Sequence, residues 1–519
     1  MSVRLHTVLI LGCLLSQCAF GAEASSANEW RQWRGPEFNG VARQSKPPIE
    51  WSESKNVRWK VAIPGDGLSV PLVLDNLVIV QTAVPSGKPA GDDAEKSGES
   101  DKDMDAPPPP PDRADGERRG GPRDGRPRGD RPRRGGPRGE GPRGDQPPGD
   151  GPRGDGARGD GPGGDGPPGG RRGGPGGGRR RNAAPTQEYK FNVIALDRKS
   201  GQTVWERTVR EMVPHEGSHG DGSLAPASPV TDGKHIFAYF GSRGLYCVDM
   251  KGNVVWDKDF GDMSTRNGFG EGSSPALAGD TLVINWDHEG DSFIVALDAN
   301  TGKERWRKAR DEATSWSTPL IVKDGDTSLA IVSGSNRIRA YELDSGNIRW
   351  ECGGLGSNCV PCPVEYKGKL IMMSGHREPA LVAVDYVGAK GDLTGTDRVF
   401  WTLDGGTPYV PSPLLYDDTI YFLQKNTGIL SCYDPATGKP HFEKQRLDKI
   451  KGVYASPVGA DGRVYIAGRG GVTNVLKRGP AFEVLATNEL DDQFDTSPAI
   501  AGNEIYMRGR ENLYCIAEN

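Results

Sequence analysis

Short apolar runs separated by turn residues recur along most of the chain and predict β-hairpins. Each begins with a small or polar residue and a proline, passes through a few apolar positions to a two-residue turn, and ends in a longer β-branched or aromatic run. Examples are SPVTDGKHIFAYF from Ser228, SPLLYDDTIYFL from Ser412 and SPVGADGRVYIAG from Ser456. Turn pairs such as Asp232-Gly233 tolerate the positive φ of tight hairpins. The pattern therefore predicts strands and not helices.

A second recurring motif follows these hairpins and joins two further strands. It appears as ALDRKSGQTVW (195–205), ALDANTGKERW (296–306), AYELDSGNIRW (340–350) and CYDPATGKPHF (432–442). Its Asp can accept hydrogen bonds from the backbone of the turn, and its Gly reaches a conformation that is costly for other residues. The closing aromatic residue presents a large flat surface. Each unit is therefore expected to contain four antiparallel strands, a to d.

The prolines that head the units give the number of repeats. They are Pro71, Pro229, Pro275, Pro319, Pro363, Pro413, Pro457 and Pro498. From Pro229 onward the spacings are 46, 44, 44, 50, 44 and 41 residues, the period of a propeller blade. Radial stacking buries both faces of each sheet. The expected fold class is all-β, an eight-bladed β-propeller of four-stranded antiparallel blades.

The two ends of the chain are expected to close the ring together. The last unit stops at LYCIAEN, one strand short, whereas Val57 to Lys60 forms a strand that no unit accounts for. We expect this N-terminal strand to complete the C-terminal blade, because closure removes the last exposed sheet edge.

The A-x-D-x-x-[ST]-G-x-x-x-W repeat resembles the tryptophan-docking motif of the pyrroloquinoline-quinone (PQQ) type β-propellers. That superfamily includes quinoprotein alcohol dehydrogenases and the lipoprotein propeller of the bacterial outer-membrane assembly machinery. The opening NEWRQWRGPEFNGV from Asn28 also resembles exported PQQ-like repeat proteins. The resemblance implies that tryptophans fasten each blade to the next. The docking residues it implies are Trp59, Trp205, Trp256, Trp306, Trp350 and Trp401.

Composition divides the chain into four segments. Residues 1–22 read as a signal peptide, with Arg4, an apolar stretch from Val8 to Leu15 and small residues near Ala22. Lipidation at Cys18 is the alternative. Residues 23–84 hold the N-terminal arm, the closing strand and the start of blade 1, and residues 189–519 hold the rest of the propeller. No later apolar run approaches the roughly 20 residues that cross a bilayer.

Residues 85–188 form a Gly-, Pro-, Arg- and Asp-rich insert in blade 1. Aromatic and β-branched residues are nearly absent, so the insert is expected to be disordered. Its Arg-rich part favours weak attraction to anionic polysaccharide, lipid or nucleic acid, but a solvated loop is the simpler interpretation. The net charge of the chain is -5, which argues against a dedicated nucleic-acid binder.

Three cysteines cluster in ECGGLGSNCVPCP, namely Cys352, Cys359 and Cys362. In an exported protein a disulfide among them is expected, with one thiol left over. Cys247, Cys432 and Cys515 instead occupy the slot of a small apolar residue in the repeat.

The candidate ligand site is the central funnel, because strand a lies innermost in propellers. Aromatic and acidic residues near the repeated prolines suit a planar or cationic ligand. The funnel residues expected are Glu271, Trp316, Asn358, Tyr409, Tyr454, Phe494 and Asp495. The string HEGSH (215–219) matches the H-E-x-x-H zinc pattern, but glycines break the helix that this pattern needs, so no metal site is predicted.

Three functions remain open from the sequence. One is an exported, non-catalytic and monomeric scaffold that binds an envelope protein or polysaccharide. The second, implied by the resemblance, is an alcohol or sugar dehydrogenase that uses PQQ and Ca²⁺. The third is attachment to surface polysaccharide or the envelope through the Arg-rich insert. The adjacent cysteine pair that typically clamps PQQ in such enzymes is missing here, which weighs against the dehydrogenase.

Overall fold

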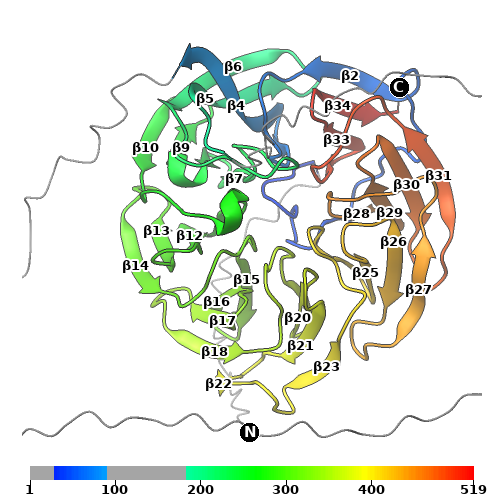
Figure 1. Ribbon diagram of the computed structural model, residues 1–519. Coiled ribbons are helices and arrows are strands. Elements are labelled where there is room, and N and C mark those ends of the chain that lie inside the picture. The colour runs from blue at the N-terminus through cyan, green and yellow to red at the C-terminus, as the bar shows by residue number, and fades with distance from the viewer. Residues whose placement is uncertain (1–27, 90–182, 519) are drawn as a thin grey trace, which may run out of the picture. The chain divides into compact units, whose positions relative to one another are not determined.

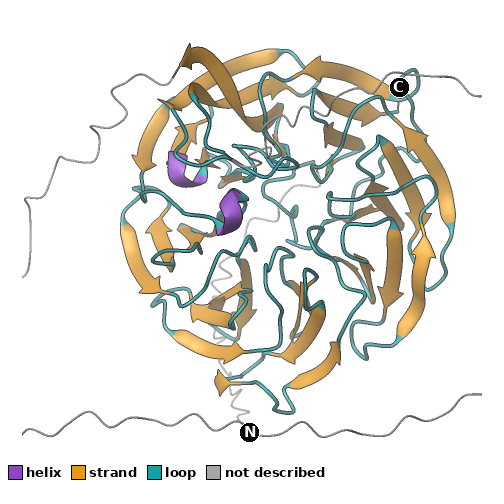
Figure 2. Ribbon diagram, in the orientation of Figure 1, coloured by secondary structure: helices purple, strands orange, loops and turns teal. Residues whose placement is uncertain are grey.

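The computed structural model describes residues 28–89 and 183–518 and places them in a ring of eight four-stranded blades (Figure 1). Apart from the single-turn 3₁₀ helices η2 (Gly241–Arg243) and η3 (Arg266–Gly268), its regular elements are strands (Figure 2). The predicted eight-bladed propeller is confirmed. The predicted signal peptide, Cys18 and most of the insert lie outside the described residues. Among those described, no helix has the length and apolar character to span a membrane.

The first four blades follow one another along the chain. Blade 1 contains β3 (Leu72–Leu74), β4 (Leu77–Pro89), β5 (Gln187–Asp197) and β6 (Thr203–Met212). Blade 2 contains β7 (Val230–Thr231), β8 (His235–Tyr239), β9 (Leu245–Asp249) and β10 (Val254–Lys258). Blade 3 contains β11 (Ala276–Ala278), β12 (Thr281–Trp286), β13 (Phe293–Asp298) and β14 (Glu304–Ala309). Blade 4 contains β15 (Leu320–Asp324), β16 (Thr327–Val332), β17 (Ile338–Glu342) and β18 (Ile348–Cys352), with β22 (Gly391–Asp392) parallel to its outer edge.

The other four blades complete the ring. Blade 5 contains β19 (Val364–Tyr366), β20 (Lys369–Ser374), β21 (Ala380–Asp385) and β23 (Val399–Leu403). Blade 6 contains β24 (Leu414–Tyr416), β25 (Thr419–Leu423), β26 (Ile429–Tyr433) and β27 (Pro440–Arg446). Blade 7 contains β28 (Val458–Ala460), β29 (Arg463–Ala467), β30 (Val472–Lys477) and β31 (Val484–Glu489), with β1 (Val41–Ala42) parallel to β28. Blade 8 contains β32 (Ala499–Ala501), β33 (Glu504–Arg508), β34 (Asn512–Ala517) and β2 (Val57–Ala62).

The N-terminal strand β2 closes the ring, as the sequence predicts. It pairs antiparallel with β34 and places Trp59 opposite Cys515. Figure 1 shows this blue strand outside the red strands of the C-terminal blade. On the inner side, β3 of blade 1 contacts β32 of blade 8. The N-terminal strand thus supplies the fourth strand that the C-terminal blade lacks.

Docking tryptophans on strand d, the outermost strand of each blade, join successive blades. The indole Nε1–H of Trp306 donates to the Leu343 carbonyl of blade 4 at 2.7 Å, and that of Trp256 donates to the Ala299 carbonyl of blade 3 at 3.0 Å. Trp59, Trp205 and Trp401 make the same contact with Arg198, Met250 and Pro435. Each ring therefore forms both an apolar contact and a hydrogen bond with the next blade.

The glycine of the next repeat makes room for each ring. Gly346 has a φ of +68°, and a Cβ atom there would lie 2.5 Å from the Trp306 ring. The Asp of the motif fixes the equivalent turn of blade 3, because Asp298 Oδ1 accepts hydrogen bonds from the backbone N–H groups of Asn300 and Thr301. The side-chain hydrogen bonds of Arg305 and Thr301 lower the pKa of Asp298.

Trp350 packs differently from the other docking tryptophans. It is fully buried, but its Nε1–H has no protein hydrogen-bond partner among the described residues. It packs against Tyr386 and Ala389 of blade 5. The connection from 386 to 398 replaces the motif in that blade, and the equivalent carbonyl, that of Tyr386, accepts the backbone N–H of Ala389 instead.

The two strands of blade 1 that flank the insert continue into the range 85–188 that the sequence assigned to it. Pro85 pairs with Tyr189 and Pro89 with Gln187, so β4 and β5 include both edges of the range 85–188. The boundaries were predicted from composition. Pro and Gly are uncommon inside strands, so composition alone does not show that the strands continue through them.

The disulfide expected among Cys352, Cys359 and Cys362 is not formed in the structure, where all six described cysteines are free thiols. Cys352 Sγ lies 3.3 Å from the Gly353 carbonyl, and Cys359 Sγ lies 3.4 Å from the Gly356 carbonyl. Cys362 Sγ instead accepts the indole N–H of Trp33 at 3.2 Å. The three thiols are near in sequence, but the connection into blade 5 directs them to three different surroundings.

We expect these thiols to resist alkylation in the native protein. Burial raises the pKa of Cys247, Cys359, Cys432 and Cys515 to about 12, so almost no thiolate forms at mildly alkaline pH. Iodoacetamide labelling followed by peptide mapping should show little modification before denaturation. After denaturation without reductant, Cys352, Cys359 and Cys362 should all be labelled. A peptide cross-linked through any two of these three would contradict the structure.

Candidate functional site

The centre of the ring contains a cavity of about 340 Å³. Its wall includes a side chain from each connection that leads into the innermost strand of a blade, so the eight blades all contribute. These side chains include Leu68, Asp221, Glu271, Trp316, Val360, Tyr409, Tyr454 and Asp495. The aromatic and apolar groups cover most of the surface, and the three carboxylates are the charged groups. This channel cavity is the candidate functional site.

A belt of hydroxyl groups surrounds the channel cavity. The backbone N–H of Ser228 donates to Ser274 Oγ at 2.9 Å, and that of Ser274 donates to Thr318 Oγ1 at 3.0 Å. On the other side, Ser412 N–H donates to Ser456 Oγ and Ser456 N–H to Ser497 Oγ. Each hydroxyl precedes one of the repeated prolines. The belt therefore links the innermost strands of neighbouring blades in the same way that the tryptophans link the outermost strands.

The N-terminal arm contributes a further wall to the channel cavity. Trp33 lines the cavity and donates its indole N–H to Cys362. Arg34 next to it is buried and donates to the carbonyls of Pro413 and Pro457, in blades 6 and 7. Trp30 pairs with Val73 in blade 1. The arm thus spans from blade 1 to blades 6 and 7, and Trp33 occupies space that an open propeller channel would leave free.

Most of the predicted funnel residues lie on the channel cavity. Those that line it are Glu271, Trp316, Tyr409, Tyr454 and Asp495. Asn358 is instead buried, accepts a hydrogen bond from Arg266 and donates one to the Tyr409 hydroxyl at 3.4 Å. The prediction for Phe494 is wrong, because its ring is fully buried against Tyr514.

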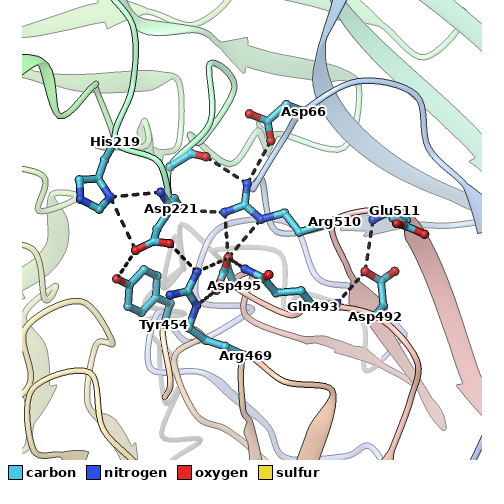
Figure 3. A network of polar contacts seen from close by, with 11 residues as sticks. Asp66, His219, Asp221, Tyr454, Arg469, Asp492, Gln493, Asp495, Arg510 and Glu511 are labelled. Carbon is cyan, nitrogen blue, oxygen red and sulfur yellow. Dashed lines mark hydrogen bonds and ion pairs between the residues drawn. The ribbon is translucent and has the colours of Figure 1, made fainter. Parts of the chain in front are cut away.

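Two arginines and two aspartates form an ion-pair cluster at one side of the cavity (Figure 3). Arg469 holds Asp495 Oδ1 at 2.5 Å and Asp221 Oδ1 at 2.9 Å. Arg510 holds Asp495 Oδ2 at 2.8 Å and also reaches Asp66. Figure 3 shows both guanidinium groups converging on Asp495 between them. The two arginines come from equivalent loops of blades 7 and 8, each following a glycine.

Tyr454 connects this cluster to the aromatic wall. Its hydroxyl donates to Asp221 Oδ2 at 2.9 Å, and the Arg469 guanidinium lies 4.1 Å from its ring centroid. Burial would raise the pKa of Asp221, but hydrogen bonds from Arg469 and Tyr454 outweigh it and lower that pKa. Burial and the hydrogen bond to Asp221 raise the pKa of Tyr454 to about 12. Asp221 is therefore held as a carboxylate and Tyr454 as a neutral phenol.

Glu271 is also fully engaged. Its carboxylate pairs with Arg243 at 2.8 Å and accepts the backbone N–H and the hydroxyl of Ser242. Both side chains of this ion pair are buried. All three carboxylates of the channel cavity are thus paired with an arginine of the protein.

The paired carboxylates do not fit a calcium site. Ca²⁺ takes six to eight oxygen ligands, among them carboxylates whose charge is available. Here a cation next to Asp221 or Asp495 would face Arg469 and Arg510. The described residues also contain no group of three or more His, Cys, Asp or Glu that converge as metal ligands. The HEGSH string lies in the irregular connection between blades 1 and 2, where His215 bonds to the Met263 carbonyl and His219 lines the cavity.

The sequence reasoning missed Arg469, Arg510, Asp221 and Trp33. A signal for the two arginines exists, because Arg243, Arg469 and Arg510 each follow a glycine within two residues in the loop between strands b and c. The hydroxyl belt also has a signal in the repeated Ser-Pro and Thr-Pro pairs. No signal pairs Asp221 with Arg469, which are distant in sequence and meet only in the closed ring.

Comparisons with known proteins agree with this architecture. The family model described as outer membrane protein assembly factor BamB matches residues 190–444. The BamB protein of Burkholderia pseudomallei (strain K96243) is 24% identical over 328 residues, which are 61% of this chain and 76% of that protein. Quinohemoprotein alcohol dehydrogenase from Comamonas testosteroni superposes with a TM-score of 0.54 at 9% identity, over 96% of this chain and 82% of that one, and so shows a common fold.

A shorter match involves an enzyme. The lanthanide-dependent methanol dehydrogenase of Methylacidiphilum fumariolicum (strain SolV) is 32% identical over 157 residues, 27% of this chain. That match spans 22% of the dehydrogenase. It covers part of the blade repeat and not a whole enzyme.

Proposed function

The chain is a PQQ-like β-propeller, and from this premise we propose that it is a non-catalytic binding scaffold of the cell envelope. The observation that carries the proposal is the pairing of Asp221, Glu271 and Asp495 with arginines of the chain itself. A carboxylate whose charge is already paired with an arginine is a poor ligand for a catalytic metal. The cavity then offers shape, aromatic surface and fixed polar groups, which are the properties of a binding site.

The relatives support the envelope location and the binding role. The match to the assembly factor of Burkholderia pseudomallei covers three quarters of that protein, far more than the match to the methanol dehydrogenase covers of the enzyme. The protein is expected to be exported by its N-terminal signal peptide and to act as a monomer.

The second candidate function is a PQQ-dependent dehydrogenase. The aromatic wall formed by Trp33, Trp316, Tyr409 and Tyr454 favours it, because flat rings suit a planar quinone. The arginine-paired carboxylates oppose it, since a metal that polarises the quinone oxygen has no ligands here.

Cofactor reconstitution tests the proposal. We expect purified protein that is incubated with PQQ and either Ca²⁺ or a lanthanide to retain no stoichiometric quinone after desalting. We also expect no reduction of an artificial electron acceptor with alcohols or sugars. The absorbance of retained quinone and the rate of dye reduction measure the two outcomes. Stoichiometric retention together with turnover would overturn the scaffold and establish the dehydrogenase.

A further inference from the structure

A second cavity, which we call the side pocket, opens beside the ion-pair cluster. Its volume is about 740 Å³, within the range of roughly 300–1,000 Å³ that small-molecule sites occupy. It lies between the connection into blade 7, at Lys449 and Lys451, and the loop of blade 7 at Gly468 to Gly470. Arg510 of blade 8 and Asp221 complete it. Asp221 lines both the side pocket and the channel cavity, so the two are neighbours.

The charge of the side pocket is positive. Its lining includes the cations Lys449, Lys451, Arg469 and Arg510 and a single carboxylate, Asp221. The two arginines and Asp221 largely compensate one another through the cluster. The two lysines are exposed, and within the described residues their side chains make neither a hydrogen bond nor an ion pair. The uncompensated charge therefore comes from Lys449 and Lys451, and it favours an anionic ligand.

Two glycines in turns, Gly220 and Gly470, leave the wall of the side pocket open. A Cβ atom at Gly470 or Gly220 would meet nothing within 4 Å, and neither residue has a positive φ. Backbone conformation and packing would therefore accept another residue at both positions. Glycine exposes backbone N–H and C=O groups and allows a ligand to approach closely. At these two positions the backbone of the side pocket is therefore open to a ligand.

The rest of the lining indicates a hydroxylated ligand. Apart from Ile450 and Val472, the wall consists of glycines, Gln493 and charged groups, whereas the aromatic residues gather in the channel cavity. A flat apolar ligand would prefer the channel cavity, and an inorganic ion would leave most of the side pocket empty. The lining suits a sugar ring that carries an acidic group, with amide and backbone groups meeting hydroxyls and the lysines meeting the acid.

We propose that the side pocket binds a uronic acid unit of an acidic polysaccharide. This inference rests on the proposed scaffold function and names the class of its partner. The lysine ammonium groups bind the carboxylate. Gln493 donates its Nε2–H to Asp495, so its Oε1, together with the glycine backbone, binds hydroxyls. Because the side pocket adjoins the channel cavity at Asp221, the next sugar along the chain would reach the face of Tyr454. The full-length protein is the binding species.

Calorimetric titration with oligogalacturonate tests the inference. We expect saturable binding that weakens as salt is raised, because the attraction is partly screened. Free galacturonate should bind more weakly than the oligomer, and fully methyl-esterified oligomer should bind at least about tenfold more weakly than the acid form, since it lacks the charge. Poly-glutamate tests an acidic peptide as the partner. Equal affinity for the esterified oligomer, preference for free galacturonate, or poly-glutamate binding as tight as the oligomer would each overturn the proposal.

Variants locate the site. Lys449→Gln with Lys451→Gln should weaken oligogalacturonate binding about tenfold through loss of two charges. Gly470→Glu should abolish binding, because it adds volume and negative charge, whereas Gly470→Ala should retain it. Lys439→Gln is the matched control, an exposed lysine in the turn at the outer edge of blade 6. Unchanged affinity in the double lysine variant would overturn the site. This result leaves the scaffold function standing, because cofactor uptake tests that function separately.

Discussion

Replacing Trp306 by alanine is expected to lower the free energy of unfolding by about 3–5 kcal/mol, the cost of deleting a buried aromatic side chain. Trp306 is 9% exposed, packs against Gly346 of the next blade and donates its indole N–H to Leu343. Its loss leaves a cavity between blades 3 and 4 and a carbonyl without its partner. Chemical denaturation followed by intrinsic fluorescence and circular dichroism measures the change.

A comparison with Trp350 separates the hydrogen bond from the packing. Trp306→Phe removes the indole N–H and should cost about 1–2 kcal/mol more than Trp350→Phe, because the Trp350 indole has no protein partner to lose. Gly346→Val should be as damaging as Trp306→Ala, since it combines a positive φ with a clash against the ring. A cost below about 1 kcal/mol for Trp306→Ala would show that the motif does not hold the blades together.

The same repeat explains why the fold was predictable. The spacing of proline, aspartate, glycine and tryptophan reflects contacts that each blade makes with its neighbour, and those contacts set strand order. Trp350 shows the limit, because its own motif is intact while the blade that should receive it lacks the matching turn. The partner of each docking tryptophan lies in the next blade of the propeller. The motif of one blade alone therefore does not determine how its tryptophan docks.

The candidate site was predictable only in part. Positions near the repeated prolines face the channel, and Trp316, Tyr409 and Tyr454 line its cavity. Phe494 and Asp495 are consecutive, but Phe494 packs against Tyr514, and only Asp495 reaches the cavity. The pairing of Asp221 with Arg469 depends on ring closure. Because Arg469 pairs with both Asp221 and Asp495, these two carboxylates are not available to a cationic ligand. The residue types in the funnel suggested a planar or cationic ligand, whereas the structure shows that its carboxylates already pair with arginines of the chain.

Breaking the buried ion pair of Arg310 and Asp287 is expected to lower the free energy of unfolding by about as much as Trp306→Ala does. Both side chains are inaccessible to solvent, with Arg310 Nε 2.6 Å from Asp287 Oδ1 and Nη2 3.0 Å from Oδ2. Arg310 also donates to the Tyr341 hydroxyl at 2.7 Å. Burial opposes the charge on Arg310, but Asp287 and Tyr341 outweigh it and raise its pKa. Arg310 therefore stays charged, and its pair with Asp287 ties the end of β12 to the connection that carries Trp316.

Arg310→Met should lower the free energy of unfolding by about 3–5 kcal/mol, because it leaves the Asp287 carboxylate buried without its counter-charge. The double variant Arg310→Met with Asp287→Leu should recover most of that loss, since no unpaired charge remains in the core. Arg305→Met is the matched control from the adjacent strand β14. Its exposed pairs with Asp280 and Asp298 should contribute less than about 1 kcal/mol. Equal losses in the single and double variants would mean that packing, and not the unpaired carboxylate, determines the cost at this junction of blades 3 and 4.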